Sequence, residues 1–189
     1  MTYTTKARPR RKLSAALGLA TASALIVLPS SAVAAGSGGV DTTGSDAPPA
    51  GSRAKLVNGQ AIPPADAPPE VVAAIEAANR IVKGKGYCLG GGHQKWNSRC
   101  YDCSGTVSYA LGKKGAGVLK SPMPSGSFMR WEQRGKGSWI TTYANPGHMY
   151  AVIAGLRLDT SSVPGKGPGW SKKLKTSNGP FKKRHPAGF

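Results

Sequence analysis

The stretch CYDCSGTVSYAL, residues 100–111, contains two of the three cysteines of the chain within four positions and then becomes apolar at helical spacing. Asp102 is a favourable N-cap residue, so a helix is expected to begin directly after it. Gly112 is expected to end that helix. Cys103 would then lie in the first turn of the helix, and the interpretation of the chain depends on what this cysteine does.

The segments around this helix predict an α+β domain. Upstream, residues 70–83 carry apolar residues near helical spacing. Downstream, residues 138–144, 148–155 and 156–161 have strand composition, and residues 181–189 are expected to form a last edge strand. Helices followed by such strands are typical of the α+β class, with N-terminal helices packed on a small antiparallel sheet.

Residues 1–34 have the layout of a secretory signal peptide. Five basic residues precede an uncharged apolar run over residues 13–28, and a small-residue cleavage site follows at residues 32–34. The alternative is a membrane anchor, but this run of 16 residues is shorter than the roughly 20 needed to span a bilayer. We therefore expect an exported protein with no stable membrane span, exposed to oxidising conditions in which disulfides persist.

The remaining chain divides into a linker and one domain. Residues 35–69 are rich in Gly, Ser, Asp, Ala and Pro and contain no aromatic residue, which predicts a disordered linker. Residues 70–189 are long enough for one domain with a single hydrophobic core.

The charge of the chain predicts an anionic partner. The net charge is +18, and without the first 34 residues the chain retains 21 basic and eight acidic residues, a net charge of +13. For an exported protein, nucleic acid is not the expected partner, and anionic cell-wall polymers or anionic lipid surfaces fit better. The alternative is a basic face that is simply solvated.

Cys103 is placed where a thiol can act as a nucleophile. The N–H groups and the dipole at a helix N-terminus favour the thiolate, which is the reactive form. His148 follows a Pro-Gly turn at the start of a predicted strand, and Asp159 ends the next strand. A hairpin closed near Gly155 would bring these two ends together, so that Asp159 could orient His148 as the base for Cys103. Taken singly, each of the three also fits a structural role: a core cysteine, an edge-strand histidine and a turn-forming aspartate.

A zinc site is the sharper alternative. Cys88, His93, Cys100 and Cys103 lie in one short glycine-rich segment, and the Cys-x2-Cys half is a metal signal. Against it, the spacing matches no zinc module that we can cite, and the site would use the cysteine best placed as a nucleophile. A Cys-x-x-Cys redox pair lacks the expected βαβ context. We therefore expect no metal and no cofactor.

Three blocks of the sequence resemble a known family. Residues 101–111, YDCSGTVSYAL, resemble the signature around the nucleophile of the NlpC family of bacterial cell-wall cysteine peptidases. Residues 87–92, YCLGGG, resemble that family's tyrosine and glycine pair, and residues 147–155, GHMYAVIAG, resemble its histidine-led strand. The text AGLRLDTS at 154–161 and the ending RHPAG at 184–188 are similar to a group from high-GC Gram-positive bacteria.

The resemblance implies a papain-like fold and a function. It implies cleavage of peptidoglycan stem peptides, between D-Glu and a diamino acid, by a secreted or wall-associated enzyme. Cys103 would be the nucleophile and His148 the base, while the Tyr87 hydroxyl would donate to the developing oxyanion. By the same resemblance, Asp102 and Ser104 contact the substrate peptide.

The resemblance also bears on the other cysteines and on the third catalytic residue. With Cys103 as the nucleophile, Cys100 is free to pair with Cys88 across the glycine loop. The third residue of that family is more often His, Asn or Gln. Here Asp159 is the nearest candidate, and His185 and His93 are the alternatives.

Two other functions remain open from the sequence. One is a related amidase or acyltransferase that uses the same thiol. The other is a non-catalytic basic module that binds the cell wall.

Overall fold

The structure, a computed structural model, describes residues 53–162, 167–174 and 179–189. The expected signal peptide and residues 35–52 of the expected linker lie outside the described residues. The described helices are α1 (Pro69–Val82), α2 (Cys103–Leu111) and α3 (Ser125–Phe128). The described strands are β1 (Lys55–Val57), β2 (Gln60–Ile62), β3 (Gly86–Tyr87), β4 (Cys100–Tyr101), β5 (Gln133–Arg134), β6 (Ile140–Ala144), β7 (Met149–Ile153), β8 (Leu156–Asp159), β9 (Gly169–Ser171) and β10 (Lys182–His185).

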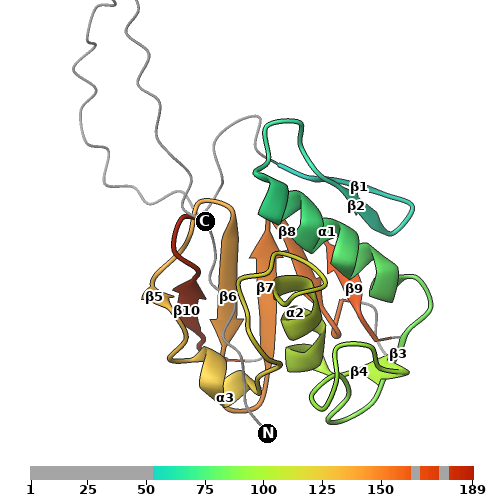
Figure 1. Cartoon of the computed structure of the whole chain (residues 1–189), viewed down its shortest axis with the longest axis vertical. Helices are drawn as coiled ribbons and strands as arrows, with labels where there is room; N and C mark the ends of the chain where they lie inside the picture. The colour runs from blue at the N-terminus through green and yellow to red at the C-terminus, as the bar shows by residue number, and fades with distance from the viewer. Residues whose placement is uncertain (1–52, 163–166, 175–178) are drawn as a thin grey trace, which may run out of the picture. The chain divides into compact units, whose positions relative to one another are not determined.

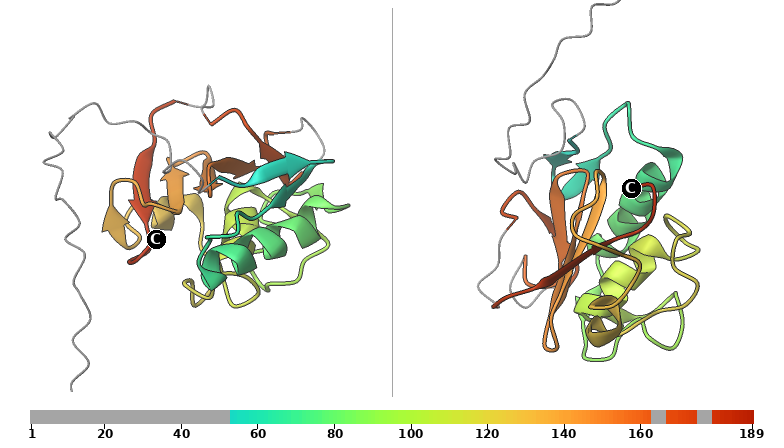
Figure 2. Two further views of the ribbon diagram at one scale, coloured as in Figure 1. Left: turned by 90° about the horizontal axis from the view of Figure 1, so that it is seen from above. Right: turned by 90° about the vertical axis from the view of Figure 1, so that its left-hand side faces the viewer.

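A six-stranded antiparallel sheet forms the centre of the described domain (Figure 1). Its strand order is β5-β10-β6-β7-β8-β9, and all neighbouring strands run antiparallel. Helices α1 and α2 lie on one face of this sheet, as both views in Figure 2 show. The predicted α+β class, with helices packed on an antiparallel sheet, is therefore confirmed.

The expected edge strand near the C-terminus is an interior strand. β10 pairs with β6 on one side and with the two-residue strand β5 on the other. The expectation was wrong because sequence order gives no indication that the short segment at Gln133–Arg134 returns to cover the outer side of β10. The edges of the sheet are instead β5 and β9.

Alternation along the central strands separates an apolar face from a polar one. In the β7–β8 pair, Ala151 lies opposite Leu158 and Ile153 lies opposite Leu156, and all four are buried toward α1 and α2. Because successive side chains of a strand point to opposite faces, Asp159 at the end of β8 belongs to the other face. The core thus fixes which residues of this hairpin are available for chemistry.

Part of the expected linker is folded. Strands β1 and β2 form a hairpin through a turn at Asn58 and Gly59, which have φ angles of 49° and 78°. Asn-Gly is the dipeptide that favours this left-handed two-residue turn, so the sequence did contain a hairpin signal. The prediction of a disordered linker was wrong for this stretch because composition outweighed that local signal.

The Asn79 side chain makes contacts that attach this hairpin to the rest of the domain. The Asn79 amide donates to the carbonyl of Ala61 at 2.7 Å, and its Oδ1 accepts from the Ala61 N–H at 3.0 Å. The same Oδ1 accepts from Nε1 of Trp170 in β9 at 2.9 Å. Asn79 therefore joins α1, the β1–β2 hairpin and the edge of the main sheet.

Replacing Asn79 by Ala is expected to destabilise the domain by about 2–4 kcal/mol, because the buried partners in Ala61 and Trp170 lose their hydrogen bonds. Denaturant unfolding monitored by tryptophan fluorescence would measure the change. The exposed Asn97 provides the control, and Asn97→Ala should stay within about 0.5 kcal/mol of the parent. Equal stability of the Asn79→Ala and Asn97→Ala proteins would contradict this role of Asn79.

Candidate active site

Cys103 is the first residue of α2, as the sequence predicted. The Asp102 carboxylate caps the helix by accepting the N–H of Gly105 at 2.7 Å. Cys103 is partly exposed and is the free cysteine of the described chain. The backbone N–H groups of a first helical turn have no partner within the helix and favour negative charge. The thiol thus lies beside the unpaired N–H groups at the start of α2.

The glycines beside Cys103 are required by close backbone contact. A Cβ added to Gly105 would lie 2.0 Å from the carbonyl oxygen of Gly91. A Cβ on Gly91 would lie 2.5 Å from the carbonyl oxygen of Cys100. Only glycine fits at these two positions, so the glycine-rich loop packs directly against the first turn of α2.

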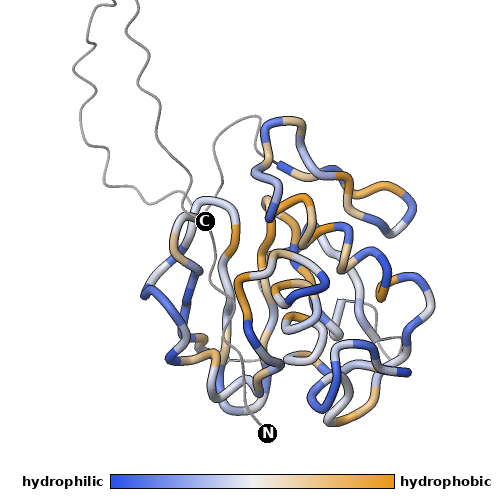
Figure 3. Tube along the Cα trace, viewed as in Figure 1, coloured by the Kyte–Doolittle hydropathy of each residue, from blue (hydrophilic) through white to orange (hydrophobic). Residues whose placement is uncertain are grey.

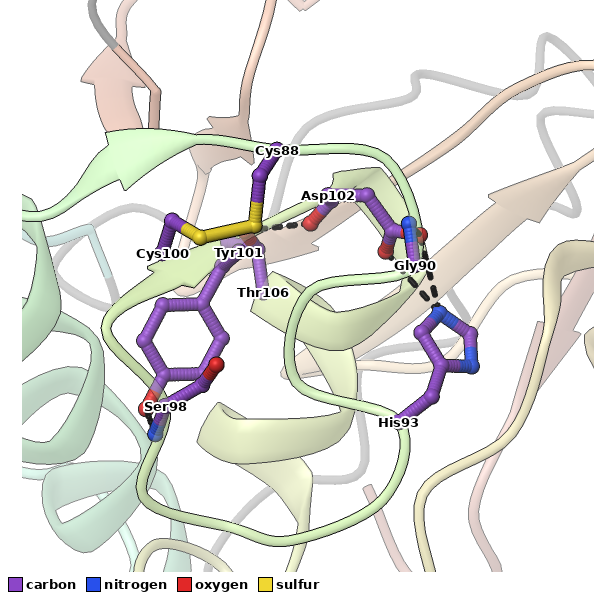
Figure 4. The surroundings of a disulfide bond; sticks show 8 residues. All are labelled: Cys88, Gly90, His93, Ser98, Cys100, Tyr101, Asp102 and Thr106. Atoms are coloured by element: carbon purple, nitrogen blue, oxygen red, sulfur yellow. Dashed lines mark hydrogen bonds and ion pairs between the residues drawn. A yellow bond between two sulfur atoms is a disulfide. The ribbon is translucent and has the colours of Figure 1, made fainter.

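Cys88 and Cys100 form the disulfide that the resemblance implied (Figure 4). The bond closes the glycine-rich loop between β3 and β4, which also pair with each other in parallel. Because these two cysteines are bonded to each other, they are not arranged as thiolate zinc ligands in this structure. Among the residues that the structure describes, no group of three His, Cys, Asp or Glu is placed to hold a metal ion.

His148 is held in place by the turn that precedes β7. The Asn145 side chain accepts the N–H groups of Gly147 at 3.0 Å and of His148 at 2.8 Å. The Asn145 N–H donates to the His148 carbonyl at 2.9 Å and closes the turn. The imidazole therefore stands at the end of the hairpin, where the sequence predicted it.

Asp159 lies beside His148. Its Oδ1 is 3.0 Å from Nε2 of His148, a distance for an ion pair, although the two groups are not aligned as a regular hydrogen bond. The Asp159 side chain is fully buried, while that of His148 is 15 % exposed. Because Nε2 faces the carboxylate, Nδ1 is the ring nitrogen left for other contacts, and the Cys103 thiol is near enough to help raise the pKa of the ring.

These contacts favour a protonated histidine. Burial alone would lower the pKa of His148, but the side-chain interactions with Asp159 and Cys103 raise it to about 9. Burial alone would raise the pKa of Asp159, but the contact with His148 and the hydrogen bonds from Ser161 hold it below its ordinary value. At neutral pH the pair is therefore an ionised Asp159 carboxylate beside a protonated His148 imidazole.

Tyr87 lies at the same end of the domain, opposite Tyr101 in the β3–β4 pair. Half of Tyr87 is exposed. Burial, together with the negative charges of Cys103 and Asp102, raises the pKa of its phenol. The hydroxyl therefore stays protonated at neutral pH, where it can act as a hydrogen-bond donor close to the thiol.

Asp102 and Ser104 are occupied by contacts within the protein (Figure 4 shows Asp102). Nε2 of His93 lies 2.9 Å from the Asp102 carboxylate and 3.1 Å from the Ser104 hydroxyl, which also donates to Asp102 at 3.1 Å. The N–H of Gly90 donates to the same carboxylate at 3.0 Å. Both Asp102 and Ser104 are buried, and their contact with a substrate stays a prediction.

The three candidates for the third residue occupy different places. Asp159 contacts His148, whereas His93 contacts Asp102 and Ser104. His185 lies in β10, where its ring nitrogens face Gln133 at 3.1 Å and the Gly135 carbonyl at 3.3 Å. Of these three, the structure therefore brings only Asp159 to the base.

Sequence reasoning missed three residues around this pair. Nε of Arg157 lies 3.5 Å from the Asp159 carboxylate, and the Ser161 hydroxyl donates to it at 2.6 Å. The alternation in LRLD, in which Arg157 and Asp159 each follow a core leucine, was a usable signal for Arg157. The ring of Phe181 packs edge-on against the His148 ring at 6.4 Å between centroids, and no local pattern indicated this long-range contact.

A comparison of the chain with protein-family models finds no match, and a comparison with curated proteins finds none either. Among the described residues, no helix combines the length and the apolar character that crossing a bilayer requires.

Cys103 is expected to be the only thiol alkylated in the folded, unreduced protein, because the other two cysteines form a disulfide. Mass spectrometry after brief iodoacetamide treatment should find one modification at Cys103, and three modifications after reduction and unfolding. Alkylation of Cys88 or Cys100 in the native protein would contradict this arrangement.

The His148 imidazole is expected to titrate near pH 9 and so remain protonated at neutral pH. In the Asp159→Asn protein the raising effect of the carboxylate is lost while burial remains, so the pKa should fall toward or below the ordinary value of about 6.5. NMR titration of the histidine ring protons would follow both proteins. An unchanged titration in the variant would show that Asp159 does not set the charge of His148.

Proposed function

We propose that the protein is a secreted cysteine peptidase that cleaves peptide bonds in peptidoglycan stem peptides, between D-Glu and a diamino acid. The observation that carries the proposal is the free Cys103 at the start of α2 beside His148, whose pKa is raised to about 9 by Asp159 and the thiol. A thiol, an imidazole and a buried carboxylate in series constitute the chemistry of an activated nucleophile.

The order of elements supports a papain-like fold of the NlpC kind. The nucleophile opens a helix that packs on an antiparallel sheet, and the base stands at the start of a strand of that sheet. The sequence resemblance covers the same three blocks that carry Tyr87, Cys103 and His148. The Cys88–Cys100 disulfide is compatible with an extracellular location.

The reaction follows from these positions. The Cys103 thiolate attacks the carbonyl carbon of the scissile peptide bond and forms a tetrahedral oxyanion. The Tyr87 hydroxyl and the N–H groups of the first turn of α2 donate to that oxyanion. The His148 imidazolium then gives its proton to the departing amine, which leaves an acyl thioester on Cys103.

Hydrolysis of the thioester completes the cycle. His148 is now neutral and takes a proton from water, which attacks the thioester carbonyl. The carboxylic acid product leaves and Cys103 returns as the thiolate beside the imidazolium. Throughout the cycle Asp159 stays ionised and keeps Nε2 of His148 directed toward itself, so that Nδ1 remains available to Cys103.

An amidase or acyltransferase would use the same acyl thioester. The transferase would release it to an amine and not to water, while the amidase would act on a different amide bond. The products distinguish these reactions, so we propose incubation of the protein with purified peptidoglycan fragments and identification of the products by mass spectrometry.

Cys103→Ala is expected to reduce cleavage by about 10³-fold or more, and His148→Ala by a similar amount, because nucleophile and base act as one unit. Asp159→Ala should have an intermediate effect, since it orients the base without touching the substrate. Tyr87→Phe, which removes only the hydroxyl, should lose about 10²–10³-fold in kcat. His93→Ala and His185→Ala serve as comparison variants and should lose much less.

Two results would contradict parts of the proposal. Full activity of Cys103→Ala on purified fragments would exclude the thiol mechanism. A loss in His185→Ala equal to that in His148→Ala would show that Asp159 is the wrong third residue. If no product forms with any wall fragment although the folded protein binds walls, the non-catalytic wall-binding module is the better description.

A further inference from the structure

The end of the sheet formed by β5 and β10 carries a basic groove. Its volume is about 360 Å³. It is lined by Met129, Arg130, Arg134, Lys182, Lys183 and Arg184. Five of these six residues are cationic and none is acidic. Figure 3 shows that the β5–β10 end is strongly hydrophilic. We call this feature the basic groove.

Arg184 makes hydrogen bonds to the elements that border the groove. Its Nε donates to the Met129 carbonyl at 2.9 Å, just past the end of α3. The Thr142 hydroxyl donates to the Arg184 carbonyl at 3.1 Å from the neighbouring strand β6. The groove is therefore a defined surface between α3 and the sheet, because β10 and the segment after α3 are joined by these contacts.

The other four cations are exposed and have no carboxylate partner within the described chain. Arg130, Arg134, Lys182 and Lys183 form none of the ion pairs found among the described residues. Like charges held this close repel one another, and an anionic ligand would relieve that repulsion. The groove thus has the charge and the donors of an anion-binding surface.

A second hollow connects the basic groove to the catalytic end of the domain. It has a volume of about 270 Å³ and shares Met129 and Lys182 with the basic groove. Pro146, two residues before His148, and Phe181 also line it. Because the Phe181 ring packs against the His148 ring, a ligand lying along both hollows would approach the candidate active site from the histidine side.

The lining favours one kind of anion. Guanidinium groups bind phosphate oxygens through paired hydrogen bonds, and neighbouring cations suit a ligand with repeated charges. Single-stranded nucleic acid binds in part by stacking its bases on aromatic side chains, and none lines the basic groove. A lipid surface would require exposed apolar anchors, but the exposed large apolar residues, Val57, Ile62, Tyr87 and Leu89, lie outside the basic groove.

We infer that the basic groove binds an anionic cell-wall polymer with repeating phosphodiester groups and thereby holds the enzyme on its substrate. This inference rests on the proposed function for the location at the wall and deepens it, since it assigns wall attachment to one surface on the His148 side of the candidate active site.

The test compares two variants of equal charge. The groove variant carries Arg130→Gln, Arg134→Gln, Lys182→Gln and Lys183→Gln. The control variant carries Lys83→Gln, Lys113→Gln, Lys114→Gln and Lys120→Gln, four exposed positions on the side of α1 and α2. Sedimentation with purified walls is measured across a salt series, together with cleavage of a soluble stem peptide.

The groove variant should bind walls about tenfold more weakly than the parent or the control, and parent binding should fall steeply above about 0.1 M salt because exposed charges are screened. Walls stripped of phosphodiester polymer by acid should retain little of the parent. Cleavage of the soluble peptide should be nearly equal in all three proteins, since its chemistry occurs at contact distance inside the cleft.

Several results would overturn the inference. These are equal loss of wall binding in both variants, unchanged binding by the groove variant, full binding to stripped walls, or stronger groove-dependent binding to RNA or anionic vesicles. Failure of the proposed function gives a different result. The parent would then cleave no peptide, while groove-dependent binding to walls would persist.

Discussion

The Asp102 carboxylate accepts hydrogen bonds from backbone N–H groups on two sides, from Gly105 in the first turn of α2 and from Gly90 in the disulfide-closed loop. The Asp102 N–H donates to the carbonyl of Gly91. The side chain and the backbone of Asp102 therefore both join the loop to the helix. Cys103 follows directly in the chain, and its position is therefore determined by these contacts. Loss of such a cap costs about 1 kcal/mol in an ordinary helix, and here it would also release the loop next to Tyr87.

The disulfide also stabilises this loop, but through the entropy of the unfolded chain and not through hydrogen bonds. Cross-linking Cys88 to Cys100 restricts the unfolded chain, and for a loop of this length the stabilisation is about 3 kcal/mol. Hydrogen bonds and the covalent bond thus hold the segment from Tyr87 to Cys103 without a large apolar core of its own. The catalytic proposal requires this rigidity, because an oxyanion donor acts only if it is already in place.

Burial of Asp159 is the second constraint on the site. An ionised carboxylate away from water is unfavourable unless it is paired, and here it has His148, Arg157 and Ser161 around it. Removing one partner of a buried pair is destabilising by about 3–5 kcal/mol in general. The arrangement that raises the pKa of His148 therefore also contributes to the stability of the β7–β8 hairpin, and the two effects cannot be varied independently at this position.

The parts of the structure that sequence reasoning anticipated depend on local patterns. The capped start of α2, the β7–β8 hairpin and the meeting of His148 with Asp159 follow from spacing, turn residues and strand alternation over short distances. The parts that it missed depend on contacts between distant segments, such as the pairing of β5 with β10 and the packing of Phe181 on His148. The β1–β2 hairpin was missed although its Asn-Gly turn is local, because composition outweighed that signal and the contact with Asn79, 18 residues from Ala61, is long-range. If the basic groove holds a wall polymer, the function also depends on segments that are distant in the sequence from Cys103. Stem peptides around the anchored protein would then be at high effective concentration. The candidate active site could therefore work with weak affinity for each peptide and with few specific contacts around a partly exposed thiol.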